Sequence, residues 1–543
     1  MGLRLSAQLV AFLVVFLSFH GACQIPPTVA IANGTIIGVN DAQNHVQKFL
    51  GVPFAEPPVG DLRLRQATPI RKAFGTWDAS HFGHSCLGPR GSNQPNGSED
   101  CLTLNIWRPE GARGKLPVLV WLYGGGLSAG YTSNPLFEGT NLVKISTEIG
   151  KPIILVTVNY RLSAFGFLNG RQMAELDLLN IGMKDQRLAF AWLQDNIGAF
   201  GGDPKKVTLA GESAGAVSIY SHMAAYGGRD DGLFRAAILE SGGAFPLTGP
   251  KTSAFQATFD GLITKTSCST YANASTTDQL DCIRKLSLDD FRNNVGSSTG
   301  QSIDGGFSPT SIQFAFPAGK YVKVATMVGA NTDEGTTSAP KGINTVAQLV
   351  GPLSAGYFRP VPLPSNMTSA IISRYPTDPR LGCPYNTGTA FSSSALDKQA
   401  CAIFGDLVQT APARMIARSL TANNGDIPVY RYRFNHLPHS TSSTPSRQGI
   451  GTGIEQSYVF SNQVPDWPYD RSLAYEMTSV WVSFASDLDP NPGGKSTLPV
   501  WPRYGANATS IVFNGYGSTI EEDEYRRDGI DYLIDNVLPY GAQ

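Results

Sequence analysis

The sequence lacks an excess of charge of either sign. Its 543 residues include 42 lysine and arginine residues against 43 aspartate and glutamate residues, which gives a net charge of −1. Proteins that bind nucleic acids or anionic membranes through their overall field carry a clear positive excess. We therefore expect no nucleic-acid partner.

Linkers, internal repeats and blocks of like charge are also missing from the chain. Such segments would mark boundaries between modules. Hydrophobic residues make up 42% of the sequence and charged residues 16%, which is enough apolar content to bury a large core. We expect one continuous globular domain over residues 24–543.

Long hydrophobic runs are absent except near the start of the chain. Residues 9–19 read LVAFLVVFLSF, with Arg4 before them and the small residues Gly21 and Ala22 after them. This arrangement is typical of a secretory signal. A membrane anchor is the alternative, but the run is well short of the roughly 20 residues that span a bilayer. We expect a signal peptide over residues 1–23, a secreted, extracellular protein and no membrane span.

Cysteine is scarce, and no CxxC motif or histidine-rich cluster accompanies it. One of the seven cysteines, Cys23, lies at the end of the expected leader. The other six form three sequence-local pairs, which in an exported chain favours disulfides over metal ligands. These six are Cys86, Cys101, Cys268, Cys282, Cys383 and Cys401.

Apolar runs typical of buried strands occur at several places, with helical patterns between them. Strands and helices that alternate, with strands apolar on both faces, predict an α/β fold in which helices cover both faces of a mostly parallel central sheet. The site is then expected at the carboxyl edge of that sheet. The predicted strands are 116–123, 153–160, 207–210, 236–239, 324–329 and 428–434, and the predicted helices include 185–197 and 469–488.

The strongest chemical signal is a G-x-S-x-G motif at Gly211–Gly215, between a predicted strand and a segment compatible with a helix. In this context the glycines allow a sharp strand-to-helix turn that exposes the serine oxygen as a nucleophile. An ordinary glycine-rich turn is the alternative, but the flanking segments favour the catalytic interpretation. We predict that Ser213 is the nucleophile.

Three glycines, Gly124, Gly125 and Gly126, follow the predicted strand that ends at Tyr123. Their backbone N–H groups can approach a substrate oxygen closely, as an oxyanion hole requires, and Ala214 directly after the serine adds another N–H group. A flexible strand exit is the alternative. Three glycines at the end of a buried strand are conformationally unfavourable, so the oxyanion hole is preferred.

Six segments resemble the type-B carboxylesterases, the α/β-hydrolase family that includes the cholinesterases and the large fungal lipases. The resemblance covers essentially the whole mature length and implies an α/β-hydrolase fold and a serine carboxylic ester hydrolase. The segments are FLGVPFAEPPVGDLRL (49–64), SEDCLTLNIWRP (98–109), YGGG (123–126), DQRLAFAWLQDNIGAFGGDP (185–204), GESAGA (211–216) and NTDEGT (331–336).

Carried over by position, the resemblance implies that Ser213 is the nucleophile, that Glu334 is the triad acid, and that Gly125, Gly126 and Ala214 are the oxyanion donors. Glu334 also follows a predicted strand on a loop, which is where this fold supplies its acid. There it would orient a histidine and stabilise the imidazolium. A solvated loop carboxylate is the alternative for Glu334.

The resemblance also implies disulfides between Cys86 and Cys101 and between Cys268 and Cys282. The pair Cys383 and Cys401 is extrapolated from the cysteines that remain. Five N-x-S/T sequons suit a glycosylated surface. They begin at Asn33, Asn96, Asn273, Asn366 and Asn507.

The chain departs from the family at the expected base. The fold orders its triad as serine, acid and histidine, so the histidine should follow residue 334. Counting back from Val459 and Phe460, the histidine position holds Thr452, and threonine cannot accept the serine proton near neutral pH. Only His436 and His439 follow residue 334. We expect His439 to substitute as the base, with His436 as the alternative, although a structural or surface role for each competes with this assignment.

The loop between Cys86 and Cys101 is short, polar and rich in turn residues. A lid for a lipid interface would need an amphipathic helix, so we expect a small or medium soluble ester as substrate rather than emulsified triglyceride. Our first expectation is a serine esterase. The missing histidine leaves two other functions open: altered chemistry on the same scaffold, such as biosynthetic acyl transfer or cyclisation, or non-catalytic cholinesterase-like binding. No metal or organic cofactor is implied.

Overall fold

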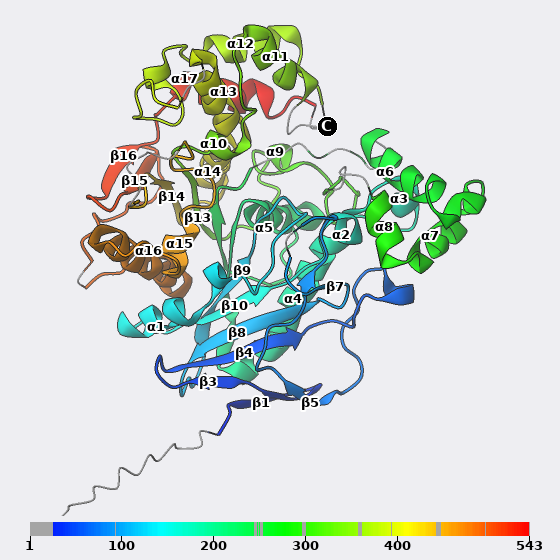
Figure 1. Ribbon diagram of the computed structural model, residues 1–543. Coiled ribbons are helices and arrows are strands. Elements are labelled where there is room, and N and C mark those ends of the chain that lie inside the picture. Colours follow the sequence, from blue (N-terminus) through cyan, green and yellow to red (C-terminus); the bar gives the residue numbers. More distant parts are fainter. Residues whose placement is uncertain are drawn as a thin grey trace, which may run out of the picture.

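A single large sheet forms the centre of the molecule (Figure 1). The computed structural model describes residues 25–92, 94–243, 247, 249, 253–295, 300–356, 361–391, 394–440, 447–494 and 496–541, so the predicted leader lies outside the described residues. The sheet has 11 strands in the order β16-β15-β14-β13-β12-β11-β9-β10-β8-β4-β3. The pairs from β10 to β15 in this order are parallel, and the strands at both edges are antiparallel.

The strands of the large sheet are mostly short, and two smaller sheets stand apart from it. The large sheet contains β3 (Val39–Asp41), β4 (Val46–Pro53), β8 (Thr103–Pro109), β9 (Leu116–Leu122), β10 (Ile154–Val158), β11 (Gly202–Glu212), β12 (Ala236–Glu240), β13 (Ala325–Asn331), β14 (Val429–Phe434), β15 (Thr509–Phe513) and β16 (Thr519–Glu522). The smaller sheets contain β1 (Thr28–Ile31), β2 (Gly34–Ile37) and β5 (Gly75–Asp78), and β6 (Ser85–Cys86) and β7 (Gly97–Ser98).

Seventeen α-helices lie within the described residues. They are α1 (Thr140–Glu148), α2 (Ser163–Phe167), α3 (Arg171–Glu175), α4 (Ile181–Asn196), α5 (Ala214–Ala224), α6 (Ser253–Thr264), α7 (Thr276–Lys285), α8 (Leu288–Asn294), α9 (Ile312–Ala315), α10 (Gly335–Ser338), α11 (Val346–Ala355), α12 (Ser365–Ser373), α13 (Ala395–Gly405), α14 (Ala411–Asn423), α15 (Gln456–Phe460), α16 (Pro468–Asp487) and α17 (Arg527–Tyr532).

The six predicted strands correspond to β9 to β14, and the predicted mostly parallel sheet is confirmed. All five residues of β10 and all five of β12 are buried, as expected for strands covered on both faces. The largest difference from the prediction is in β11, which extends from Gly202 to Glu212 and so reaches the G-x-S-x-G motif directly. The antiparallel edge strands, such as β8 and β16, were not predicted.

Helices cover both faces of the sheet (Figure 1). Helix α16 packs on β9 and β11 beside α1 and α15, whereas α5 packs on β9, β11 and β12 beside α4. A second, smaller core unites α3, α6, α7 and α8 at one end of the molecule. The six cysteines form the three predicted disulfides, Cys86–Cys101, Cys268–Cys282 and Cys383–Cys401.

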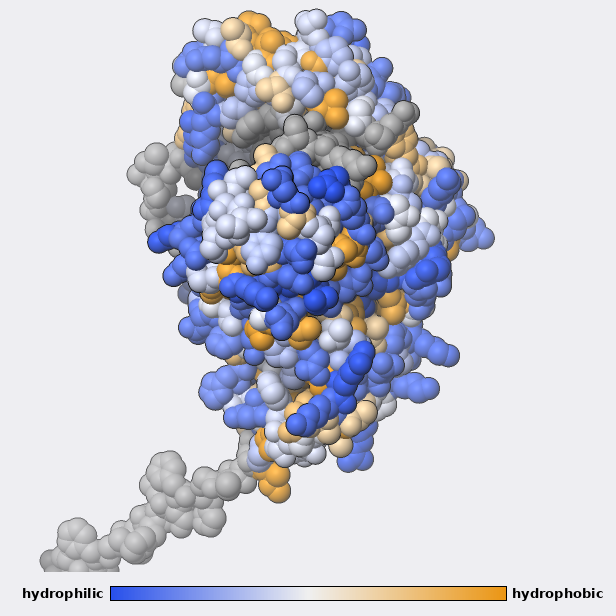
Figure 2. All heavy atoms as spheres, turned by 90° about the vertical axis from the view of Figure 1, so that its right-hand side faces the viewer, coloured by the Kyte–Doolittle hydropathy of each residue, from blue (hydrophilic) through white to orange (hydrophobic). Residues whose placement is uncertain are grey.

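The surface carries small groups of apolar residues scattered among polar and charged ones on the face shown in Figure 2. Scattered apolar residues are normal on the surface of a folded protein. Among the described residues, no helix is both long and apolar enough to cross a membrane.

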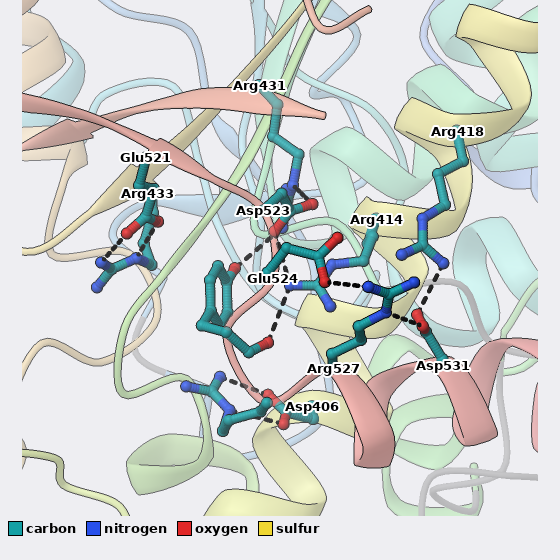
Figure 3. Close-up of polar contacts among 12 residues, drawn as sticks. Asp406, Arg414, Arg418, Arg431, Arg433, Glu521, Asp523, Glu524, Arg527 and Asp531 are labelled. Carbon is teal, nitrogen blue, oxygen red and sulfur yellow. Dashed lines mark hydrogen bonds and ion pairs between the residues drawn. The ribbon is translucent and has the colours of Figure 1, made fainter. Parts of the chain in front are cut away.

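A buried group of ion pairs joins β14, α14 and the end of β16 (Figure 3). Asp523 accepts from Arg414 Nη2 and from Arg431 Nε, each at 2.7 Å, and from the Tyr504 hydroxyl at 3.1 Å. Burial opposes ionisation of Asp523, but Arg431 and Arg414 together hold its pKa well below the usual range. We call Asp523, Arg414, Arg431 and Tyr504 the arginine cluster; it ties the C-terminal strands to the sheet.

Candidate active site

Ser213 lies in the turn between β11 and α5. Its backbone has φ 53° and ψ −120°, a conformation that is unfavourable for a residue other than glycine and that is found where function requires it. Its N–H donates to the carbonyl of Glu240 at 2.8 Å, and its carbonyl accepts from the N–H of Val217 at 2.9 Å. The Ser213 hydroxyl makes no hydrogen bond with any described residue. The turn is therefore fixed by its backbone while the side-chain oxygen stays available.

The two glycines of the motif allow β11, α5 and β9 to approach closely. A Cβ atom at Gly215 would lie 2.0 Å from the carbonyl oxygen of Leu122, and one at Gly211 would lie 2.7 Å from the same oxygen. Both distances are far inside van der Waals contact, so no other residue fits. This packing explains the residue types that the motif requires on either side of Ser213.

The loop after β9 places three glycines beside the turn that contains Ser213. A Cβ atom at Gly124 would lie 3.0 Å from Ser213 Cβ, so this loop contacts the turn. Gly125 and Gly126 follow with φ 109° and 64°. Their N–H groups, and that of Ala214 in the first turn of α5, donate to no described acceptor. Three free backbone donors near the serine can stabilise an oxyanion.

Glu334 follows β13 and is 1% exposed. Its Oε1 accepts from the Ser241 hydroxyl at 2.6 Å and from the N–H of Asn331 at 2.7 Å, and its Oε2 accepts from the Thr452 hydroxyl at 2.6 Å. Burial raises the pKa of Glu334, although the three hydrogen bonds oppose the rise. Thr452 thus holds the position at the acid that a histidine base would hold in a triad.

Four buried carboxyl groups surround the strand ends, and we call Glu212, Glu240, Glu334 and Glu455 the carboxyl cluster. Glu240 accepts from Trp481 Nε1 at 2.6 Å, and Glu455 accepts from Asn331 Nδ2. No described lysine, arginine or histidine forms an ion pair with any of the four. The cluster is therefore acidic without a counter-ion among the described side chains.

Burial and mutual repulsion keep these carboxyl groups reluctant to ionise. Burial raises the pKa of Glu455 to about 8, with a further contribution from the charge of Glu334. Burial also raises the pKa of Glu212 well above its usual range, and the charges of Glu455, Glu334 and Glu240 add to the rise. Glu212 accepts no hydrogen bond from a described residue.

The two candidate histidines lie in other surroundings. His436 is 1% exposed, with its Nε2 3.1 Å from Asp470 Oδ1 and its Nδ1 accepting from the N–H of Gly515 at 3.2 Å. The ring of His439 stacks on Trp467 with 4.1 Å between ring centroids. Neither histidine contacts Ser213 or Glu334 among the described residues. The structure thus joins Thr452 to Glu334 and places Glu212, the neighbour of Ser213, close to Gly453, whereas it brings neither histidine to Ser213 or Glu334.

Two polar residues of the site were not identified from the sequence. Glu455 lies three residues after Thr452, and Asn331 lies three residues before Glu334. Asn331 donates to both carboxyl groups, through its N–H group to Glu334 and through its side-chain amide to Glu455. The available signal was that Asn331 lies within the motif NTDEGT and that Glu455 lies close to Thr452. That signal could not show that both side chains turn into the protein rather than into solvent.

Comparison with known proteins agrees with this architecture. The model of the carboxylesterase family matches residues 25–528. Secreted lipase 1 of Botryotinia fuckeliana is 34% identical, over 94% of this chain and 93% of that protein. Fumonisin B1 esterase of Sphingopyxis macrogoltabida is 30% identical, over 94% of this chain and 92% of that protein.

Among solved structures, the crystal structure of EstA from Aspergillus niger superposes with a TM-score of 0.80 at 27% identity. The match covers 94% of this chain and 97% of that one. The α/β-hydrolase fold predicted from the sequence is confirmed by this likeness and by the mostly parallel sheet. The chain belongs to the carboxylesterase family.

Proposed function

We propose that the protein is a secreted carboxylic ester hydrolase that acts through an acyl-Ser213 intermediate. The observation that carries the proposal is the conformation of Ser213, held at φ 53° between β11 and α5 with an unengaged hydroxyl. Other serines of the chain also have a positive φ, but the strand-to-helix turn within G-x-S-x-G at the carboxyl edge of the sheet is the position of a nucleophile in this fold. Its family membership supports the same reaction class.

In this mechanism Ser213 Oγ attacks the ester carbonyl, and the N–H groups of Gly125, Gly126 and Ala214 bind the oxygen that becomes negative. Glu334 is the triad acid. The collapse of the tetrahedral intermediate expels the alcohol, and water then hydrolyses the acyl-serine. The oxyanion donors stabilise both half-reactions.

No residue of this site is assigned as the general base. Thr452 donates its hydrogen bond to Glu334 and cannot take up the serine proton. The contacts of His436 and His439 give no support to the substitute role expected for them. Loss of esterase activity in His439→Ala or His436→Ala would restore that assignment, because removal of a triad base lowers turnover by up to about 10⁶-fold.

A second function is favoured by the same Thr452–Glu334 hydrogen bond. A site with a nucleophile and an oxyanion hole but no base suits an acyl transfer or cyclisation in which another reactant completes the chemistry. A non-catalytic binding protein is the further alternative. Retention of the strained serine turn weighs against it, because such strain has no use in a pocket that only binds.

The proposed substrate is a small or medium soluble ester. The loop between Cys86 and Cys101 contains the short strand β7, and no helix among its described residues. An interfacial lid would need an amphipathic helix there. The comparison proteins named as lipases are thus no guide to the preferred substrate of this chain.

Export is part of the proposal: a signal peptide over residues 1–23 precedes one catalytic domain over residues 24–543. Four of the five sequon asparagines are exposed and open to glycosylation, whereas the amide of Asn33 donates to the carbonyl of Ile70 at 3.0 Å. The four exposed positions are Asn96, Asn273, Asn366 and Asn507.

A fluorophosphonate probe tests the nucleophile. The purified protein is incubated with the probe and digested, and the peptide that contains Ser213 is examined by mass spectrometry. Because no described residue supplies a base, we expect the adduct on Ser213 to form slowly in the parent and to be absent in Ser213→Ala. A protein labelled elsewhere, or one that keeps its esterase activity in Ser213→Ala, would refute the assignment.

A further inference from the structure

The described residues leave Ser213 without a proton acceptor. A nucleophilic serine passes its proton to a group that is itself hydrogen-bonded to the triad acid. The group bonded to Glu334 Oε2 is the hydroxyl of Thr452, at 2.6 Å. A threonine hydroxyl does not accept a proton near neutral pH, so the proton of Ser213 needs another acceptor.

The carboxyl group of Glu212 has no described hydrogen-bond partner, which is a second and independent indication that a ligand group binds here. Glu212 is 5% exposed and accepts no hydrogen bond from a described residue, and its oxygens keep some accessible surface, so water or a ligand can reach them. A Cβ atom at Gly124 would lie 2.5 Å from Glu212 Oε2, and one at Gly453 would lie 3.5 Å from Oε1. The unpartnered carboxyl group therefore lies between the start of the oxyanion loop and the neighbour of Thr452.

The surroundings favour a positive charge. The four members of the carboxyl cluster form no ion pair with a described cationic side chain. A cation beside these carboxyl groups favours their ionised form, so a group that becomes positive when it takes up a proton is stabilised there and can donate charge-assisted hydrogen bonds to them. A basic nitrogen has this chemistry.

We propose that the natural substrate is an ester whose acyl part carries a basic nitrogen, and that this nitrogen lies beside Ser213 between Thr452 and Glu212 and acts as the missing base. The inference rests on the proposed function, because it requires an acyl-Ser213 intermediate. A nitrogen in the acyl part remains in the site after the alcohol has left. It therefore assists both half-reactions, whereas a nitrogen in the alcohol part would assist only the first.

The proton balance closes without another reactant. The nitrogen lone pair takes the Ser213 proton as Oγ bonds to the carbonyl carbon, and the carbonyl electron pair moves to the oxyanion. When the carbon–oxygen bond to the alcohol breaks, the protonated nitrogen returns the proton to the leaving alkoxide. Water then attacks the acyl-serine and gives a proton to the same nitrogen, which passes it to Ser213 Oγ as the acid product departs.

Three matched ester series test the proposal. Each is a set of p-nitrophenyl alkanoates with linkers of increasing length that end in an imidazol-1-yl, a pyrrol-1-yl or a 3-methylimidazolium ring. The rings are similar in size and shape, but pyrrole is not basic and methylimidazolium carries charge without a free lone pair. Release of p-nitrophenol is measured at neutral pH, and hydrolysis in the presence of Ser213→Ala is subtracted as background.

For at least one linker length we expect kcat/KM for the imidazolyl ester to exceed that of both analogues by about 100-fold, the usual contribution of a positioned base. If methylimidazolium and imidazolyl esters react alike and faster than the pyrrolyl ester, the site recognises charge only and the base role is overturned. Equal rates for all three esters overturn the proposal entirely.

Two variants locate the effect. Glu212→Gln keeps the shape of the side chain, and we expect it to reduce the imidazolyl preference at least tenfold; Glu522→Gln, the same change on the exposed edge strand β16, serves as the control. Thr452→His supplies a base from the chain, so the preference should fall toward unity. An unaltered preference in both site variants contradicts the placement of the nitrogen.

Failure of the inference and failure of the proposed function give different results. If Thr452→His is labelled at Ser213 by the fluorophosphonate but the parent shows no imidazolyl preference, only the substrate inference fails. If neither protein is labelled, the nucleophile assignment fails as well.

Free imidazole added to the parent gives a measurement that does not depend on how the variant folds. A saturable acceleration of pyrrolyl ester hydrolysis supports a site for a basic nitrogen, and no acceleration contradicts it.

Discussion

Two groups of buried charged residues lie in this molecule, and they are built in opposite ways. In the arginine cluster the carboxylate of Asp523 lies between two guanidinium groups, and Asp523, Arg414 and Arg431 are all 1% exposed or less (Figure 3). In the carboxyl cluster four acidic side chains lie together, and none of them forms an ion pair with a described cation. Only in the first does the carboxyl group have cationic partners among the described residues.

The presence or absence of cationic partners distinguishes a structural cluster from a functional one. A buried carboxylate with its counter-ions present is fully satisfied and has nothing to offer a ligand. A buried carboxyl group without them has a raised pKa, as Glu212 and Glu455 do, and such perturbed groups gather at functional sites. The arginine cluster therefore holds strands together, and the carboxyl cluster leaves room for the chemistry of a substrate.

The largest expected effect comes from removal of the shared carboxylate in the arginine cluster. Asp523→Asn leaves Arg414 and Arg431 buried without an anionic partner, so we expect a loss of about 3–5 kcal/mol in the free energy of unfolding. The measurement is denaturant unfolding followed by tryptophan fluorescence. A loss as small as that of a surface pair would show that water reaches these arginines.

A basic side chain placed in the carboxyl cluster has the next largest effect. Thr452→His places an imidazole beside Glu334 Oε2, and if that ring also reaches Ser213, hydrolysis of p-nitrophenyl butyrate should rise on the order of 10²- to 10³-fold. The double variant with Ser213→Ala is the control and should lose the gain. Activity that stays at the parent level would mean that Glu334 and Ser213 are not aligned for a triad.

The two clusters also predict opposite dependence on pH. The folded-state pKa of Glu455, about 8, lies above its ordinary value of 4.5. Its contribution to stability is therefore complete below pH 4.5 and is lost as the pH rises toward 8. Glu455→Gln removes this loss, so the variant should be more stable than the parent at pH 8 and match it at pH 4.5.

The pKa of Asp523 is lowered, so its stabilising contribution is present above the ordinary value of 3.8 and is lost only as the pH falls below it. Thermal midpoints of the parent, Glu455→Gln and Asp523→Asn measured across this range separate the two contributions. Parallel pH profiles for the parent and Glu455→Gln would contradict the raised pKa.

The smallest effect is expected at an exposed ion pair. Arg380 lies 2.6 Å from Asp378 on the surface, with 72% of the arginine side chain exposed. Exposed pairs contribute little because water screens them, so Arg380→Ala should leave the thermal midpoint unchanged within error. A shift comparable with that of Asp523→Asn would show that burial does not distinguish the pairs.

Much of the sheet could be predicted from the sequence, because its central strands are apolar on both faces and alternate with helices. The strands β9 to β14 and the helices α4 and α16 all follow from such runs. The edge strand β16 was not predicted because its sequence, TIEE, is mostly exposed and it pairs only with β15. The position of β16 depends on its pairing with β15 rather than on the residue types within β16.

The site could be predicted where a motif fixes the local backbone. Ser213, Gly125 and Gly126 follow from glycines that permit a particular turn or a close approach. The base could not be predicted in this way, because its position depends on tertiary contacts around Glu334 and around the two histidines. No local pattern shows that His436 bonds to Asp470 or that His439 stacks on Trp467.

The sequence alone determined the family, the parallel sheet, the serine turn and the presence of threonine where a histidine is expected, since each of these is written in local residue types and spacings. Only the tertiary structure decided that Thr452 binds Glu334 and that Glu212 has no described partner. It also decided that the arginines pair with Asp523 rather than with the acidic residues near Ser213. Pairing and burial of charged groups depend on contacts between residues far apart in the chain, which local sequence patterns do not encode.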